Sequence, residues 1–74
     1  MSIFYEIRAY PNAAVEVESE AAKNEMVRLY IETGSKHVCV VTWKRAYDKY
    51  DHDRSCGMDI YENGVKRGID ISGG

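Results

Sequence analysis

The chain begins with alternating apolar and polar positions, the pattern of a half-buried strand. Pro11 and Asn12 then interrupt this pattern. The next segment, residues 14–18 (Ala-Val-Glu-Val-Glu), fits either a second short strand or an early helical turn, and the sequence leaves both alternatives open. Between residues 3 and 10, one side of the first strand carries Ile3, Tyr5, Ile7 and Ala9, and the other carries Phe4, Glu6, Arg8 and Tyr10.

Residues 20–33 have the composition and spacing of an amphipathic helix. Ser19 suits the N-cap position, and Gly34 suits the position that follows a helix. The expected apolar stripe is broader than one small sheet face needs. It consists of Ala22, Met26, Leu29 and Tyr30, widened by Val27 and Ile31, and lies opposite Asn24, Glu25, Arg28 and Glu32.

Two segments after the helix predict the rest of a sheet. Residues 37–43 are β-branched and apolar on both sides, which is typical of a central strand. Asn63-Gly64 predicts a type I′ hairpin turn between residues 58–62 and 65–71, because both turn residues tolerate positive φ. In that hairpin Met58 and Ile60 share a face with Ile69 and Ile71, whereas Asp59, Tyr61, Lys66 and Asp70 point the other way.

These elements predict an α+β protein with one domain over residues 1–74. The expected order is strand, helix and three strands, with an optional extra strand before the helix. The sheet should be mainly antiparallel with about four strands, and the helix should cover one face. One helix cannot cover both faces, so aromatic surface would be left for a partner or a homodimer. The uncovered face is expected to carry Phe4, Tyr10 and Tyr61, plus either Val38 and Val40 or Cys39, Val41 and Trp43.

Composition and charge narrow the range of functions. The 74 residues contain 10 Lys+Arg and 12 Asp+Glu, a net charge of −2, so direct attraction to nucleic acid or to anionic lipid is not expected. No apolar run approaches the ~18 residues that span a bilayer, and the N-terminus lacks the pattern of a secretory signal. The expected location is the cytoplasm, where both cysteines would be free thiols.

The long segment 45–57 contains residue types that catalysis would use. Catalysis by a nucleophile, a base and an orienting acid would use Cys56, His52 and either Asp51 or Asp53, which lie close together in the sequence. A domain of this size rarely encloses the ~300 Å³ that ligand sites use. We therefore expect no enzymatic activity and no cofactor.

Zinc binding is an alternative interpretation of the histidines and cysteines. His37 and Cys39 lie two residues apart on a strand, and together with His52 and Cys56 they would supply four ligands. Their spacing resembles no standard zinc motif, so a small zinc-stabilised domain remains an alternative and no metal site is assigned.

Segment 45–57 also interleaves tyrosines with aspartates, which favours a protein-binding surface. Tyrosine offers a large rigid contact area at a low cost in entropy. The acidic and aromatic strip could meet an Arg/Lys-rich surface normally used for nucleic acid, or it could be a solvated loop. The residues predicted to contact a partner are Tyr47, Asp48, Tyr50, Asp51, Asp53 and, from the hairpin, Tyr61.

The hairpin carries one resemblance to a known family. Residues 60–66, Ile-Tyr-Glu-Asn-Gly-Val-Lys, are similar to the Tyr-Glu-Asn-Gly hairpin of small phage-encoded type I anti-CRISPR proteins. The similarity covers seven residues, and the hairpin leads the chain in that family but ends it here. The resemblance implies a non-catalytic inhibitor from a phage or mobile element that occludes a host nucleic-acid-handling complex, with Tyr61 as an exposed contact residue.

The C-terminus carries a second resemblance. Residues 70–74, Asp-Ile-Ser-Gly-Gly, follow an element order that looks like that of ubiquitin and the β-grasp sulfur carriers, if residues 14–18 form a strand. This resemblance covers the order of elements and the last two residues. It implies an alternative function, in which Gly73 and Gly74 present a terminal carboxylate for adenylation.

Overall fold

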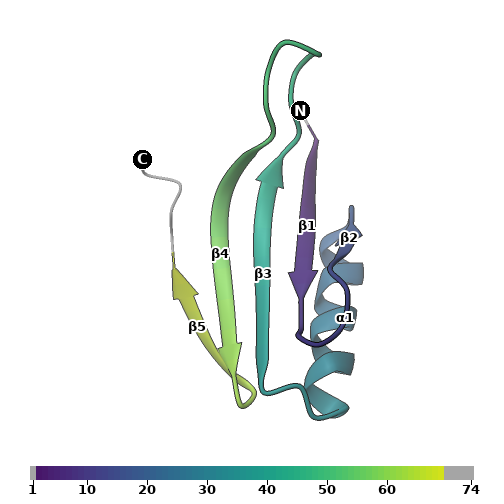
Figure 1. The fold of residues 1–74 in the computed structure, drawn as a ribbon, viewed down its shortest axis with the longest axis vertical. Helices are drawn as coiled ribbons and strands as arrows, with labels where there is room; N and C mark the ends of the chain where they lie inside the picture. Colours follow the sequence, from purple (N-terminus) through teal and green to yellow (C-terminus); the bar gives the residue numbers. More distant parts are fainter. Residues whose placement is uncertain (1, 70–74) are drawn as a thin grey trace.

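The computed structural model describes residues 2–69, which form a five-stranded antiparallel sheet and one helix (Figure 1). The strands lie in the order β2-β1-β3-β4-β5, and the helix packs on one face of the sheet. The α+β prediction is confirmed, and the ambiguous segment before the helix is a strand. In chain order the elements are β1 (Ile3–Arg8), β2 (Val15–Val17), α1 (Glu20–Glu32), β3 (His37–Lys44), β4 (Arg54–Glu62) and β5 (Val65–Ile69).

The core lies between α1 and the part of the sheet formed by β1 and β3. Ile7 and Val40 are paired across these two strands and are almost completely buried, as is Val38. Val27 is the buried residue of the helix. Ala9 completes this cluster just beyond β1, so the predicted inward side of the first strand is confirmed at Ile7 and Ala9.

The ends of α1 match the prediction closely. The Ser19 hydroxyl accepts a hydrogen bond from the backbone N–H of Ala22 at 3.0 Å, which caps the N-terminus. Gly34 has a φ of 98°, the left-handed conformation that commonly ends helices. The predicted apolar stripe of the helix included Leu29, but this side chain is 42% exposed, so the buried stripe is narrower than predicted. The reason is that α1 packs over β1, β2 and β3, and its backbone does not come close to β4 or β5 within residues 2–69.

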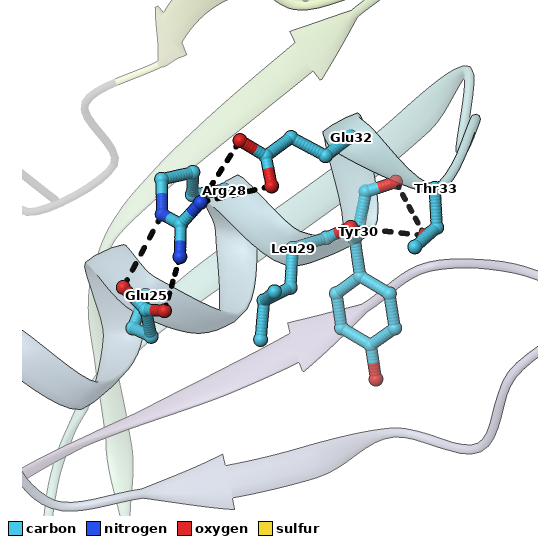
Figure 2. A network of polar contacts seen from close by, with 6 residues as sticks. All are labelled: Glu25, Arg28, Leu29, Tyr30, Glu32 and Thr33. Carbon is cyan, nitrogen blue, oxygen red and sulfur yellow. Dashed lines mark hydrogen bonds and ion pairs between the residues drawn. The ribbon is translucent and has the colours of Figure 1, made fainter.

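The outer side of α1 is held by polar contacts (Figure 2). Arg28 donates hydrogen bonds to the carboxylates of Glu25 and Glu32, one turn away on either side. The hydrogen bond from Arg28 holds the pKa of Glu25 below its usual value. At the C-terminal end, the Thr33 hydroxyl donates to the carbonyl oxygen of Leu29 at 2.9 Å. These contacts stabilise the exposed face and leave the opposite side of the helix for packing.

The β4–β5 hairpin turns at Asn63 and Gly64, as predicted. Their φ values are 51° and 81°, so both turn residues have the positive φ that a type I′ turn requires. The backbone N–H of Asn63 donates to the carbonyl oxygen of Lys36 at 2.8 Å, which ties the turn to the segment before β3. Met58 pairs with Ile69 in the expected register. Asp70 and Ile71 lie outside the described residues.

The register between β3 and β4 reverses the faces predicted for β4. Val38 pairs with Tyr61, so Tyr61 lies on the helix side and packs against the core. Met58 pairs with Val41 and lies on the other side. The prediction that Tyr61 lies on the uncovered face is therefore wrong. The physical reason is that the face of each β4 residue follows from the pairing of β4 with β3, which the alternation within β4 does not determine.

The sheet face opposite α1 is called the open face below. It carries Phe4, as predicted. It also carries Cys39, Val41 and Trp43, which was one of the two alternatives predicted for β3. Tyr10, also predicted on this face, instead lies in the turn after β1 and is 89% exposed. From β2 to β4 the open face includes Glu16, Phe4, Glu6, Arg8, His37, Cys39, Val41, Trp43, Met58, Ile60 and Glu62.

Candidate functional site

Residues 45–53 connect β3 to β4 and are called the hairpin loop. This loop is distinct from the Asn63-Gly64 turn of the β4–β5 hairpin. β3 and β4 are the two longest strands, and the loop lies at one end of the molecule, beyond the sheet (Figure 1). Tyr47 and Tyr50 are 89% and 83% exposed, so neither ring contributes to the core. The Nζ of Lys49 lies 5.1 Å from the centre of the Tyr50 ring. The loop therefore presents two large aromatic side chains to the surroundings.

The aspartates of the hairpin loop organise its backbone. The Asp53 carboxylate accepts a hydrogen bond from the backbone N–H of Ala46 at 2.6 Å and so closes the base of the loop. The Asp48 carboxylate accepts one from the backbone N–H of Tyr50 at 2.8 Å. Such local bonds are the usual reason that aspartate is favoured in turns. They fix the backbone that carries the tyrosines.

Asp51 has a similar role. Its carboxylate accepts hydrogen bonds from the backbone N–H of His52 at 2.8 Å and from the Arg54 guanidinium at 3.4 Å. The bond from His52 is the main reason that the pKa of Asp51 is lowered, and Arg54 adds to it. Asp51 Oδ1 is thus engaged by groups of the chain itself.

The charges around the hairpin loop are of both signs. A cleft of about 360 Å³ lies beside Tyr47, and its lining includes three basic side chains. The predicted strip of acids is therefore balanced by basic residues, and the distinctive feature of the surface is its two tyrosines. The cleft is lined by Lys44, Arg45, Tyr47, Asp51, His52 and Arg54.

The structure gathers five of the six predicted contact residues and separates the sixth. Tyr47, Asp48, Tyr50, Asp51 and Asp53 all belong to the hairpin loop. Tyr61 lies at the other end of β4, partly buried against the core on the helix side. A single partner surface that includes Tyr61 and the loop would have to extend along the whole of β4.

The residues considered for zinc binding and for catalysis are not assembled. His37 begins β3, whereas His52 lies in the hairpin loop at the opposite end of that strand. Among residues 2–69, no three potential metal ligands form a group. No hydrogen bond within the same range joins the His52 ring to Cys56 or to Asp53.

A second surface, which sequence reasoning did not single out, lies on the open face near the base of the hairpin loop. It is a shallow cleft of about 190 Å³, called the aromatic cleft below, which is lined by Phe4, Glu6, Glu16, Trp43 and Asp53. The sequence placed Phe4 and, as one alternative, Trp43 on the uncovered face, but it gave no indication that Glu16 and Asp53 would lie beside them. The registration of Glu6 with Glu16 across β1 and β2 depends on the fold.

Comparisons with protein-family models, curated proteins and solved structures found no match to this chain. Within residues 2–69, α1 is too short and too polar to cross a membrane, and it is the one helix found there. Gly73 and Gly74, on which the sulfur-carrier alternative depends, lie outside the described residues.

Proposed function

We propose that this protein is a non-catalytic protein-binding module that contacts its partner through the hairpin loop. The observation that supports the proposal is the exposure of Tyr47 and Tyr50, 89% and 83%, on a backbone held by hydrogen bonds. Tyrosines are enriched among the residues that dominate binding energy. A loop that is already ordered loses less entropy on binding than a flexible one.

The proposed mode of action is stoichiometric occlusion of a host protein or nucleoprotein complex. This is the action that the resemblance of the β4–β5 hairpin to anti-CRISPR proteins implies. The net charge of −2 favours contact with protein over direct contact with nucleic acid. The molecule is elongated, with extents of 40 × 22 × 21 Å, so a loop at one end could enter a recess that a round domain would not reach.

The proposal is tested by affinity capture from bacterial lysate with three tyrosine variants. Tyr47→Ala and Tyr50→Ala should each weaken partner binding by more than about 1 kcal/mol, because each removes a contact ring. Tyr10→Ala is the matched control, since Tyr10 is also 89% exposed but lies at the opposite end of the sheet.

All three variants should unfold at the same temperature as the unmodified protein, because none of the rings is buried. Recovery of the same partner in undiminished amount by both loop variants would refute the proposal. Loss of the partner in Tyr10→Ala alone would move the contact surface to the other end of the molecule.

A further inference from the structure

Two nearly parallel, stacked aromatic rings line the aromatic cleft. The rings of Phe4 and Trp43 are 6.3 Å apart between centroids and inclined by only 11°. These residues pair across β1 and β3, and both point to the open face. Phe4 is buried and Trp43 is partly exposed, so the aromatic surface accessible to a ligand belongs to Trp43. Aromatic faces attract cations and planar groups that can stack on them.

Three carboxylates from three different segments line the aromatic cleft together with these rings. Glu6 belongs to β1, Glu16 to β2 and Asp53 to the hairpin loop, and all three line the aromatic cleft. Glu6 Oε1 accepts hydrogen bonds from Trp43 Nε1 at 3.3 Å and from Arg8 at 2.8 Å. Glu16 forms no ion pair with any residue in the range 2–69, so its charge has no counterpart there.

The chain itself places a guanidinium against the same aromatic pair. The Arg45 guanidinium carbon lies 4.4 Å from the centre of the Phe4 ring, and its Nη2 lies 3.1 Å from Glu18 Oε1. Arg45 is not among the residues that line the aromatic cleft, and the Trp43 side chain remains partly exposed. Arg45 therefore both stacks on an aromatic ring and pairs with a carboxylate. The aromatic cleft offers the same two kinds of contact to a second guanidinium.

We propose that the aromatic cleft binds the guanidinium of an arginine side chain presented by a partner protein. Arginine fits better than lysine, because its planar group stacks on rings while its N–H donors reach carboxylates on several sides. An apolar side chain would offer no counter-charge to Glu16 and Asp53, and an acidic one would be repelled. The occupant is therefore defined by its charge and by its shape.

This inference rests on the proposed function only in that the arginine belongs to a protein partner. The hairpin loop and the aromatic cleft share Asp53 and lie next to each other, so one partner could contact both. Binding of a small arginine analogue nevertheless requires neither Tyr47 nor Tyr50. The two proposals can therefore fail separately.

The test is a titration monitored by NMR through the indole N–H of Trp43, which is the only tryptophan of the chain. N-acetyl-arginine amide is the probe, and N-acetyl-citrulline amide is its neutral control of nearly the same shape. The arginine analogue should shift the Trp43 resonance in a saturable manner, and the citrulline analogue should not. Added salt should weaken the binding, because the carboxylates are near the surface.

Two variants with the same change in charge sharpen the test. Glu16→Gln should weaken binding of the arginine analogue by about fivefold, in line with the loss of one exposed ion pair. Glu62→Gln removes the same charge at the far end of the open face, and there the affinity should stay unchanged. Equal unfolding temperatures of the two variants would show that both are folded.

The inference is overturned if the arginine analogue gives no saturable shift, if citrulline gives an equal one, or if Glu16→Gln binds as tightly as Glu62→Gln. Tyr47→Ala and Tyr50→Ala should bind the arginine analogue with unchanged affinity. If they do so and still capture the partner, the function proposed for the hairpin loop fails while the aromatic cleft stands.

Discussion

Cys39 lies at the centre of the open face, between Arg8 of β1 and Ile60 of β4. Burial raises the pKa of the Cys39 thiol, and Arg8 opposes this effect while Glu6 and Asp59 add to it. The folded protein therefore holds this proton more tightly than the unfolded chain does. The resulting contribution to stability is present below the ordinary thiol pKa and is lost as the pH rises through the raised value.

The raised pKa predicts slow alkylation of Cys39. In a Cys56→Ser variant, the rate of reaction with iodoacetamide should rise with pH at a higher midpoint than that of the same variant unfolded in urea, because the thiolate is the reactive form. Mass spectrometry of samples quenched over a range of pH measures both curves. A folded-state midpoint at or below the unfolded one would contradict the argument.

The tyrosines show which single-residue properties could be predicted from the sequence. Tyr47 and Tyr50 lie among turn-forming aspartates with no apolar periodicity, and the structure leaves both exposed. Tyr61 lies in a clean alternating pattern, which fixes its neighbours on the same side but not which side faces the helix. That choice depends on how β4 pairs with β3, which is a non-local property.

At the scale of elements, the β4–β5 turn and the ends of α1 were predictable because their chemistry is local. Ser19, Gly34, Asn63 and Gly64 each act through their own backbone conformation or through a residue three positions away. The register of β4 was not predictable. The hairpin loop separates β4 from β3, and an irregularity at Thr42/Trp43 shifts their pairing. Such a shift moves side chains to the other face of the sheet.

The turn glycine gives a prediction at this scale. Gly64→Ala should destabilise the protein by about 1 kcal/mol, because its φ of 81° is unfavourable for a residue with a Cβ. The added Cβ would lie 3.5 Å from Ile31 Cγ2, an ordinary contact, so the cost comes from the backbone.

Gly57→Ala is the matched control for this substitution. Gly57 lies within β4, and a Cβ there would meet the Thr42 side chain at 3.9 Å without a clash. Urea unfolding of both variants should show the larger loss in Gly64→Ala. A greater loss in Gly57→Ala would mean that the turn tolerates the left-handed conformation of alanine better than β4 tolerates a side chain.

At the scale of the whole molecule, the aromatic cleft shows what a sequence pattern cannot reveal. Its lining comes from β1, β2, β3 and the hairpin loop, so it exists only when segments far apart in the described chain are brought together. Each lining residue alone has an ordinary explanation as an outward strand position or a loop cap. Their combination around one pair of rings is a property of the folded sheet.

The uneven cover of the sheet predicts uneven local stability. β3 pairs with a strand on each side and packs under α1, whereas β5 pairs with β4 alone and lies away from the backbone of α1. Opening β5 should therefore expose less apolar surface than opening β3. Backbone amides of β3 around Val40 and Val41 should exchange with solvent at least about 100-fold more slowly than those of β5.

Amide hydrogen exchange followed by NMR measures this difference directly. Adding denaturant at low concentration should leave the β5 rates nearly unchanged, because a local opening exposes little surface, while the β3 rates should increase in parallel with global unfolding. Equal protection in β3 and β5 would show that the sheet opens only as a unit. In that case opening β5 would cost as much free energy as opening β3, although β5 pairs with β4 alone.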